Sequence, residues 1–396
     1  AVPCESRNQL SGTLGGNCSC TRKSRSRNTG ARKMSRTVMI MAGGTGGHVI
    51  PALAVARELQ KQSRNVVWLG TRRGLEARLV PAAGIDMEWV QIRGLRQGGW
   101  RRWLLAPFQL LHALWQSLRA MQRCKPALVL GMGGFVSGPG GLAAWLLRRP
   151  LIIHEQNAVA GLTNRLLSHL AKDVYEAFPG AFKAGIKARH VGNPVRTEII
   201  ELDAPERRLA SRQGPLRVLV FGGSQGALSL NQEVPRALGR VADKGEFDVR
   251  HQAGERTIEV ARQAYRDAGL EVEIEPFIED MASAYAWADL VICRSGALSV
   301  AEIAAAGLAS VLVPFPAAVD DHQTVNADFL VSAGAARLLP EPELRAGKLE
   351  PLLIEFLQSR QTLMDMAVAA RAQAKPHALQ ALVSACVAAG KWEGAS

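Results

Sequence analysis

The sequence predicts an α/β protein built from two Rossmann-like halves, each with a parallel sheet. A short apolar run, Thr37 to Ala42, leads into a glycine loop and then into a helical pattern, Val49 to Gln60. The same order recurs far downstream, with a strand at Leu216 to Gly223, a loop at Ser224 to Ala227 and a helix from Leu228. Other apolar runs alternate with helical stretches, which is typical of βαβ units. We therefore expect two similar halves that face each other.

The composition indicates a globular chain behind a polar N-terminal segment. Of the 396 residues, 47% are hydrophobic and 21% are charged, and the net charge is +13. Residues 1–33 are rich in Ser, Arg, Gly and Asn and lack an apolar stretch. We expect a disordered leader there, neither a signal peptide nor part of the fold. The cysteines show no disulfide or metal spacing, which favours a reducing compartment.

The first glycine loop, AGGTGGH at Ala42 to His48, joins the first strand to the first helix. Free backbone N–H groups at such a helix start form an anion site, most often for phosphate. The dinucleotide pattern GxGxxG counted from Gly44 fails, because its third glycine is replaced by Val49. His48 stands in the first helical turn, where its imidazole could act as a general base. It could equally serve only to hydrogen-bond the loop.

Two further strands of this half are expected at Asn65 to Gly70 and Met87 to Ile92. The longest uncharged window, Pro126 to Leu147, contains six glycines and two prolines. We interpret it as strand, loop and helix rather than as a membrane span. Its glycine-rich loop, within Ala127 to Gly141, could hold a second anion. The half ends at His190 to Arg196, where a Gly-Asn-Pro turn suits a hinge.

A cluster of polar residues ends the strand that begins at Leu151. The cluster is His154, Glu155, Gln156 and Asn157. In open α/β sheets, ligands bind at the carboxyl ends of the strands. The functional hypothesis is therefore a ligand-facing loop, and the alternative is a buried polar network that supports the loop.

Arginines and tryptophans gather between residues 93 and 123 without an intervening acid in the first part. The arginines are Arg93, Arg96, Arg101 and Arg102, and the tryptophans are Trp100, Trp103 and Trp115. A helix from Phe108 places Phe108, Leu111, Trp115 and Leu118 on one stripe. This stripe is either an ordinary core face or a patch that contacts an anionic membrane surface. Nucleic acid is not expected, because no helix-turn-helix, RRM or KH signature is present.

The second half offers a helix start and a polar loop as candidate ligand sites. Its later strands are expected at Phe247 to Ala253, Leu270 to Phe277, Asp289 to Arg294 and Ala309 to Phe315. Ser299 and Glu302 have capping-box spacing, although the Glu302 carboxylate could instead accept hydrogen bonds from two sugar hydroxyls. A polar loop follows at Asp320 to Ala327, and the last helix, 376–396, is expected to cross back to the first half.

No two aspartates are separated by one residue, a pattern that many metal-dependent sugar transferases use. Diphosphate charge would then be neutralised by helix dipoles, backbone N–H groups and arginine. Six motifs in this order resemble those of the MurG glycosyltransferases of peptidoglycan synthesis: AGGTGGH, LGMGGFVSGPGG, HEQN, GNPVR, FGGSQGA and CRSGALSVAEIAAAG. The resemblance runs from Met34 to near the C-terminus.

The resemblance implies a GT-B fold and an inverting transfer. GlcNAc would pass from UDP-GlcNAc to the 4-hydroxyl of MurNAc in lipid I, undecaprenyl-pyrophosphoryl-MurNAc-pentapeptide, to give lipid II, with no cofactor and no metal. Residues 34–196, with 376–396, would form the acceptor and membrane domain, and residues 197–375 the domain that binds UDP-GlcNAc. Such a protein is expected to be peripheral on the cytoplasmic face of the bacterial inner membrane.

The family motifs also imply residues that contact the donor in both halves. From the first half these are Thr45, Gly46, Gly47 and, at the sugar, Asn157. Arg196, at the end of the first half, and Ser224, in the second, serve the nucleotide and diphosphate, and Ile278 of the second half meets uracil through its backbone. The helix start Ala297, Leu298, Ser299, Val300, Ala301 and Glu302 serves the phosphates and ribose, and Gln323 reads the GlcNAc hydroxyls. His48 is the first choice of base and Glu155 the second.

Two other functions fit parts of the pattern. A UDP-GlcNAc 2-epimerase of the same fold would need neither the tryptophan–arginine face nor the second glycine loop. A nucleotide-sugar-binding protein without turnover would keep its function when His48 is replaced by Ala.

Overall fold

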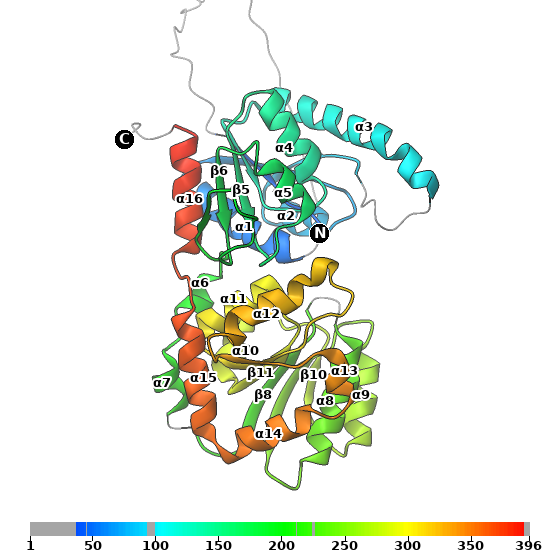
Figure 1. Cartoon of the computed structure of the whole chain (residues 1–396), viewed down its shortest axis with the longest axis vertical. Helices are drawn as coiled ribbons and strands as arrows, with labels where there is room; N and C mark the ends of the chain where they lie inside the picture. Colours follow the sequence, from blue (N-terminus) through cyan, green and yellow to red (C-terminus); the bar gives the residue numbers. More distant parts are fainter. Residues whose placement is uncertain (1–36, 45, 93–99, 211, 224–225, 392–396) are drawn as a thin grey trace, which may run out of the picture. The chain divides into compact units, whose positions relative to one another are not determined.

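The computed structural model describes residues 37–391, apart from 45, 93–99, 211 and 224–225, and apart from the side chains of 100–105 and 319 (Figure 1). The expected leader, Thr45 and Ser224 lie outside the described residues. The described strands form two parallel sheets, and each sheet uses a continuous stretch of the chain. The first sheet is built before residue 191 and the second after residue 215.

The first sheet has seven strands in the order β3-β2-β1-β4-β5-β6-β7. Their bounds are β1 Thr37–Met41, β2 Asn65–Gly70, β3 Asp86–Trp89, β4 Leu128–Gly131, β5 Leu151–Glu155, β6 Asp173–Glu176 and β7 Ala188–His190. The helices between them are α1 Gly46–Lys61, α2 Glu76–Ala82, α3 Trp100–Cys124, α4 Ser137–Leu146 and α5 Leu162–Leu167. Strand order reverses between β1 and β4, which is where open α/β sheets bind ligands.

The second sheet has six strands in the order β10-β9-β8-β11-β12-β13. Their bounds are β8 Leu216–Phe221, β9 Phe247–Gln252, β10 Glu273–Glu275, β11 Leu290–Cys293, β12 Ala309–Leu312 and β13 Ala336–Leu338. The surrounding helices are α6 Thr197–Ile200, α7 Pro205–Leu209, α8 Leu228–Arg240, α9 Ile258–Asp267, α10 Met281–Trp287, α11 Ala297–Ala306, the short 3₁₀ turn η2 Val319–Asp321, α12 His322–Val331, α13 Glu341–Arg345, α14 Leu349–Gln358 and α15 Arg360–Ala372.

Each sheet is covered on both faces, which explains the unbroken apolar strands in the sequence. In β1, Val38 and Ile40 enter one core and Met39 and Met41 enter the core on the opposite face. This alternation follows from the two-residue period of a strand. The last helix, α16 (Ala378–Ala389), packs on α1 in the first of these cores, whereas α15 packs on α11 beside the second sheet.

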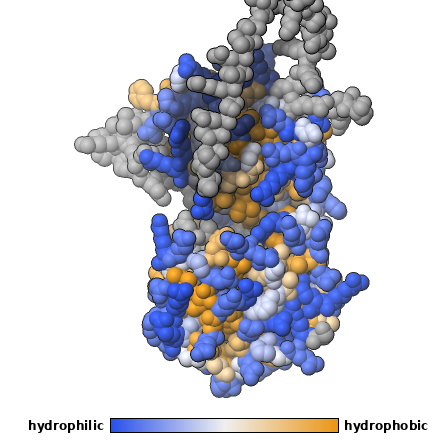
Figure 2. Space-filling model, turned by 180° about the vertical axis from the view of Figure 1, so that it is seen from behind, coloured by the Kyte–Doolittle hydropathy of each residue, from blue (hydrophilic) through white to orange (hydrophobic). Residues whose placement is uncertain are grey.

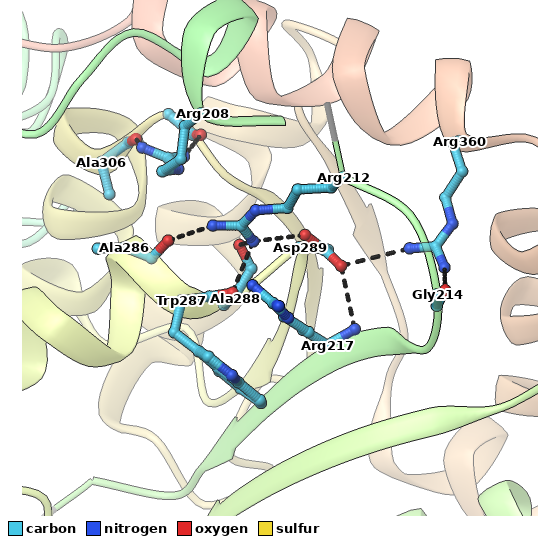
Figure 3. Close-up of polar contacts among 11 residues, drawn as sticks. Arg208, Arg212, Gly214, Arg217, Ala286, Trp287, Ala288, Asp289, Ala306 and Arg360 are labelled. Atoms are coloured by element: carbon cyan, nitrogen blue, oxygen red, sulfur yellow. Dashed lines mark hydrogen bonds and ion pairs between the residues drawn. The ribbon is translucent and has the colours of Figure 1, made fainter. Parts of the chain in front are cut away.

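The segment that connects the two halves is held against the second half by arginines (Figure 3). The guanidinium of Arg212 donates to the carbonyl oxygens of Ala286, Trp287 and Ala288 at the end of α10, and to Asp289. Arg208 donates in the same way to carbonyls at the end of α11. These contacts satisfy carbonyl groups that a helix end leaves unpaired.

Three expectations about elements need correction. The strand expected at Leu270 to Phe277 spans only Glu273–Glu275, an edge strand that Pro276 cannot extend because it lacks an N–H. The helix expected from Phe108 begins at Trp100 and accommodates Pro107. The strand expected at Met87 to Ile92 is Asp86–Trp89. Among the described residues, no helix is long and apolar enough to span a bilayer.

Candidate active site

One cavity of about 1860 Å³ is lined by loops at the carboxyl ends of both sheets. The first sheet contributes the loops after β1, β4 and β5, and the second contributes the loops after β8, β9, β11 and β12. The lining includes both glycine loops of the first half, the cluster at the end of β5 and the start of α11. The fold therefore brings segments that lie far apart along the chain together around this cavity.

The first glycine loop is held by a buried carboxylate that the sequence analysis missed. Gly44 has φ +95° and donates its N–H to Oε2 of Glu76 at 3.1 Å. Oε1 of Glu76 accepts from the N–H and the hydroxyl of Thr71 at 3.1 and 2.7 Å. The available signal was an acid in the first turn of a helix that follows a strand. One amide of the predicted anion site is thus already used, while Gly46 and Gly47 line the cavity.

The second glycine loop packs directly against the first. Gly133 and Gly134 have φ values of +94° and +84°. A Cβ on Gly134 would lie 2.3 Å from the carbonyl oxygen of Gly43, and a Cβ on Gly133 would lie 2.7 Å from Nδ1 of His48. Both positions therefore require glycine, for the backbone angle and for the space.

His48 lies in the first turn of α1 and forms part of the cavity wall. Its Nδ1 is 2.6 Å from Oε1 of Gln156, the residue after β5. The two hypotheses for His48 are therefore compatible, since the side chain both hydrogen-bonds the protein and lines the cavity. Gln156 belongs to the polar cluster, but the sequence analysis did not count it as a site residue.

Glu155 organises the loop after β5. Its Oε1 accepts from the backbone N–H and the side-chain amide of Asn157 at 3.0 and 3.2 Å, and its Oε2 accepts from Gly161 N–H at 3.1 Å and Asn164 Nδ2 at 2.8 Å. The side chain is buried. This is the buried polar network given above as the alternative, although Glu155 also lines the cavity. Asn157 remains part of the cavity lining.

Two buried asparagines join the halves beside the cavity. Asn193, in the predicted hinge, donates its side-chain N–H to the carbonyls of Gln156 at 3.0 Å and Ala297 at 3.3 Å. Oδ1 of Asn326, in α12, accepts from the N–H of Ala158 at 2.7 Å. Because buried polar groups need partners, these bonds tie the loop after β5 to the second half.

Glu302 is an ion-pair partner rather than a cap. Its Oε1 accepts from Nε and a terminal nitrogen of Arg196 at 3.2 and 2.8 Å, and its Oε2 accepts from the Tyr285 hydroxyl at 3.2 Å. Burial raises the pKa of Glu302 in spite of these stabilising bonds. The capping box with Ser299 was wrong, since α11 begins at Ala297 and its N-cap is Gly296. Arg196 and Glu302 both line the cavity.

The other predicted contacts divide into cavity residues and core residues. Those lining the cavity are Ile278, Ala297, Leu298, Ser299 and Gln323. Val300 is fully buried in the core, its N–H donates to the Gly296 carbonyl, and it is not part of the cavity lining. Ala301 packs against the same core and is not part of the cavity lining. The free donors at the start of α11 are therefore its first residues.

The apolar stripe of α3 is exposed at Phe108, Leu111 and Trp115, so the core-face hypothesis was wrong for these three, whereas Leu118 is partly buried and packs against the core. Phe108, Leu111 and Trp115 are 71%, 63% and 47% exposed. The Arg119 guanidinium lies 3.9 Å from the centroid of the Trp115 ring. The side chains of Trp100 and Trp103 lie outside the described residues.

The molecular face shown in Figure 2 is largely hydrophilic, with hydrophobic residues gathered in patches.

The described residues contain no group of three His, Cys, Asp or Glu side chains that could hold a metal ion. Two facing parallel-sheet domains with a shared cavity at their strand ends define the GT-B class of fold. Residues 38–176 match the glycosyltransferase family 28 N-terminal domain, and residues 217–382 match the glycosyltransferase family 28 C-terminal domain. The chain belongs to glycosyltransferase family 28.

Curated relatives match this chain over almost their whole length. The chain is 56% identical over 354 residues to the UDP-N-acetylglucosamine–N-acetylmuramyl-(pentapeptide) pyrophosphoryl-undecaprenol N-acetylglucosamine transferase of Alkalilimnicola ehrlichii, covering 89% of this chain and 99% of the relative. The protein of the same name from Nitrosococcus oceani gives the same identity and coverage. The predicted resemblance to the MurG glycosyltransferases is confirmed.

Solved structures also share the fold. The crystal structure of MurG from Acinetobacter baumannii is 44% identical, with a TM-score of 0.76, and the match covers 88% of this chain and 99% of that chain. UDP-GlcNAc 2-epimerase from Neisseria meningitidis, solved with UDP-GlcNAc, has a TM-score of 0.58 at 14% identity, covering 88% of this chain and 98% of that chain. The likeness to the epimerase is one of fold alone.

Proposed function

We propose that this chain transfers GlcNAc from UDP-GlcNAc to the 4-hydroxyl of the MurNAc sugar in lipid I, forming lipid II for peptidoglycan synthesis. The relatives named for this reaction match 89% of the chain at 56% identity. The observation that carries the proposal within the molecule is the single cavity lined by both halves. Such a cavity can hold a donor and an acceptor together, which removes much of the entropic barrier to their reaction.

The donor is assigned to the second half and the acceptor to the first. At the start of α11, the first backbone N–H groups and the helix dipole face the cavity and suit the diphosphate. Arg196 also borders the cavity, and a guanidinium binds phosphate oxygens well. Gln323 lies at the same wall, with its Oε1 accepting from the Phe315 N–H at 2.9 Å, which leaves its amide N–H groups for sugar hydroxyls.

His48 is the proposed general base. It takes the proton from the acceptor hydroxyl as the hydroxyl oxygen attacks the anomeric carbon and UDP leaves with the bonding electron pair. The leaving diphosphate is stabilised by amides and arginine, so the reaction needs no metal ion. Glu155, whose four accepted hydrogen bonds hold its loop, acts by positioning Asn157 at the cavity wall.

The exposed stripe on α3 is proposed to contact an anionic membrane at the cytoplasmic face. Phe108, Leu111 and Trp115 would enter the headgroup layer, and Arg119, stacked on Trp115, would meet anionic lipid. The acceptor carries a polyprenyl chain that stays in the bilayer, so the first half must approach it. Trp100, Trp103 and their neighbouring arginines continue the same part of the sequence.

The decisive experiment measures UDP release from UDP-GlcNAc with and without a lipid I analogue. Release should depend on the analogue and should persist in EDTA. His48→Ala should lower kcat by about 10²- to 10⁴-fold, the usual contribution of a general base. His169→Ala, which removes an exposed histidine outside the cavity, serves as the control. Acceptor-independent conversion of UDP-GlcNAc to its C2 epimer, without net UDP release, would instead support the epimerase alternative, and full activity of His48→Ala would contradict the assigned base.

Vesicle binding tests the membrane proposal separately. Phe108, Leu111 and Trp115 are changed together to Ser, and a second variant adds Trp100→Ser and Trp103→Ser. Binding to anionic vesicles should weaken, while Val368→Ser, at an exposed apolar position on α15, should bind as before. Unchanged binding of both stripe variants would contradict a membrane role.

A further inference from the structure

We propose that His154 and Gln156 form a buried relay that holds His48 with its proton on Nδ1, leaving Nε2 as the lone pair that receives the acceptor's proton. The inference rests on the proposed role of His48 as base. It makes Gln156 and His154 positioning residues, since neither is placed against the reacting atoms.

The relay starts at the carbonyl oxygen of Gly192. Nε2 of His154 lies 2.9 Å from this oxygen, so Nε2 must carry the proton and donate it. His154 is fully buried, and burial lowers its pKa to about 4, so the ring is neutral near pH 7. A neutral imidazole has one N–H. Nδ1 of His154 is therefore an acceptor.

Gln156 passes this constraint to His48. Its Nε2 lies 3.0 Å from Nδ1 of His154 and 3.1 Å from the His154 carbonyl oxygen, and both are acceptors. Turning the amide over would place its oxygen against both of them, so the amide has a single favourable orientation. Its Oε1 then faces Nδ1 of His48 at 2.6 Å and can only accept. Nδ1 of His48 must donate, and Nε2 is left without a proton.

The surroundings fix the relay in place. Gln156 is buried, and its backbone carbonyl accepts from the Asn193 side chain, which also binds Ala297 in the second half. Gly133 leaves just enough room for the pair, because a Cβ there would lie 2.7 Å from Nδ1 of His48 and 3.4 Å from Oε1 of Gln156. When Nε2 takes the proton, the imidazolium keeps its Nδ1–H bond to the Gln156 oxygen, which stabilises the new charge.

The test is nitrogen NMR of the full chain labelled at histidine, with the His48 signals assigned by their loss in His48→Ala. The wild-type protein should show the Nδ1–H tautomer at His48. Gln156→Leu, which removes the acceptor, should show both tautomers. Gln156→Glu should keep the Nδ1–H form at His48, because one carboxylate oxygen still accepts there, although the other oxygen now faces Nδ1 and the carbonyl of His154. Kinetically, Gln156→Leu should lower kcat by about 10- to 100-fold with little change in KM, and Gln156→Glu should recover part of the loss.

The matched control is Asn231→Leu. Asn231 is a buried amide whose Oδ1 lies 3.1 Å from Nε2 of His251, in the second half and outside the cavity lining. This change should lower stability but leave the His48 nitrogen signals unchanged. A wild-type His48 with its proton on Nε2 would overturn the relay, as would an unaltered tautomer in Gln156→Leu. If Gln156→Leu fails to fold, the wild-type and Gln156→Glu spectra still decide. These spectra are independent of turnover, so failure of the proposed reaction is recognised separately in the UDP assay.

Discussion

The two halves hold their buried carboxylates in different ways. In the first half, Glu155 and Glu176 end strands and Glu76 begins α2, and each accepts hydrogen bonds from backbone N–H groups of the loops around it. In the second half, carboxylates pair with arginines, mostly from other elements, although Arg345 lies on α13 with its partner Glu341. These pairs are Asp289 with Arg212 and Arg360, Glu302 with Arg196, and Glu341 with Arg294 and Arg345.

The difference has a physical consequence for each half. A carboxylate that accepts several backbone N–H bonds fixes one loop conformation, because each bond lost leaves a buried donor unpaired. A guanidinium, by contrast, can exchange a carboxylate for a phosphate of similar geometry. The first half is thus built to hold a rigid wall around His48. The second sheet's side of the cavity has two arginines, Arg196 and Arg294, each paired with a carboxylate.

The largest expected effect comes from breaking the most buried pair of the second half. Asp289→Ala leaves Arg212 and Arg360 without their carboxylate, and it frees the N–H of Arg217, which donates to Asp289 at 3.1 Å (Figure 3). The free energy of unfolding should fall by about 3–5 kcal/mol, as for other buried pairs that lose one partner. Urea unfolding measures it. Asp243→Ala, which removes an exposed partner of Lys244, should give no measurable change.

In the first half, Glu155→Gln tests the amide-bound type of carboxylate. The new amide must turn an NH₂ group toward two N–H donors, either those of Asn157 or those of Gly161 and Asn164. We expect a loss of about 2–3 kcal/mol in the free energy of unfolding. A variant of unchanged stability whose kcat fell 100-fold would point to Glu155, rather than His48, as the base.

The sequence predicted the parts of this design that are local. Apolar runs located the central strands, and glycines followed by a helical pattern located the loops that line the cavity. The partners of the carboxylates could not be predicted, because Arg196 and Glu302 meet only through the fold, across 106 residues. The capping-box interpretation failed for this reason, since the short-range partner Ser299 was visible in the sequence and the long-range partner was not.

The α3 stripe shows a second limit. The helical period correctly put Phe108, Leu111 and Trp115 on one face, but periodicity does not say whether another element covers that face. Edge strands are a third case, since β7, β10 and β13 are three residues each and their short segments carry little pattern.

Acid pH should weaken both halves to a similar extent. Burial lowers the pKa of His154 to about 4 and that of His251 to about 3, against about 6.5 in an unfolded chain. Protons therefore bind the unfolded state first, so this stability is present above pH 6.5 and is lost as the pH falls toward 4. Between pH 7.5 and 5, each histidine should cost about 2 kcal/mol of unfolding free energy.

Replacing one histidine in each half separates these contributions. His251→Gln can still hydrogen-bond Tyr265 and Asn231 but cannot titrate. It should therefore remove the contribution of His251 to the pH dependence of the unfolding free energy. His154→Gln should remove the other. If neither variant altered the slope of unfolding free energy against pH, the acid sensitivity would have another source.

The smallest effect is expected where an arginine pair is exposed. Glu341 binds both Arg294, which is largely buried, and Arg345, which is 62% exposed. Burial tends to raise the pKa of Glu341, but the bonds to Arg294, Ser229 and Arg345 outweigh it and hold the pKa below its usual value. Arg345→Ala should cost less than about 0.5 kcal/mol of unfolding free energy, and the loss should vanish in high salt, because water and ions screen the pair. A loss as large as that of Asp289→Ala would mean that pairing itself, rather than burial of the pair, stabilises the second half.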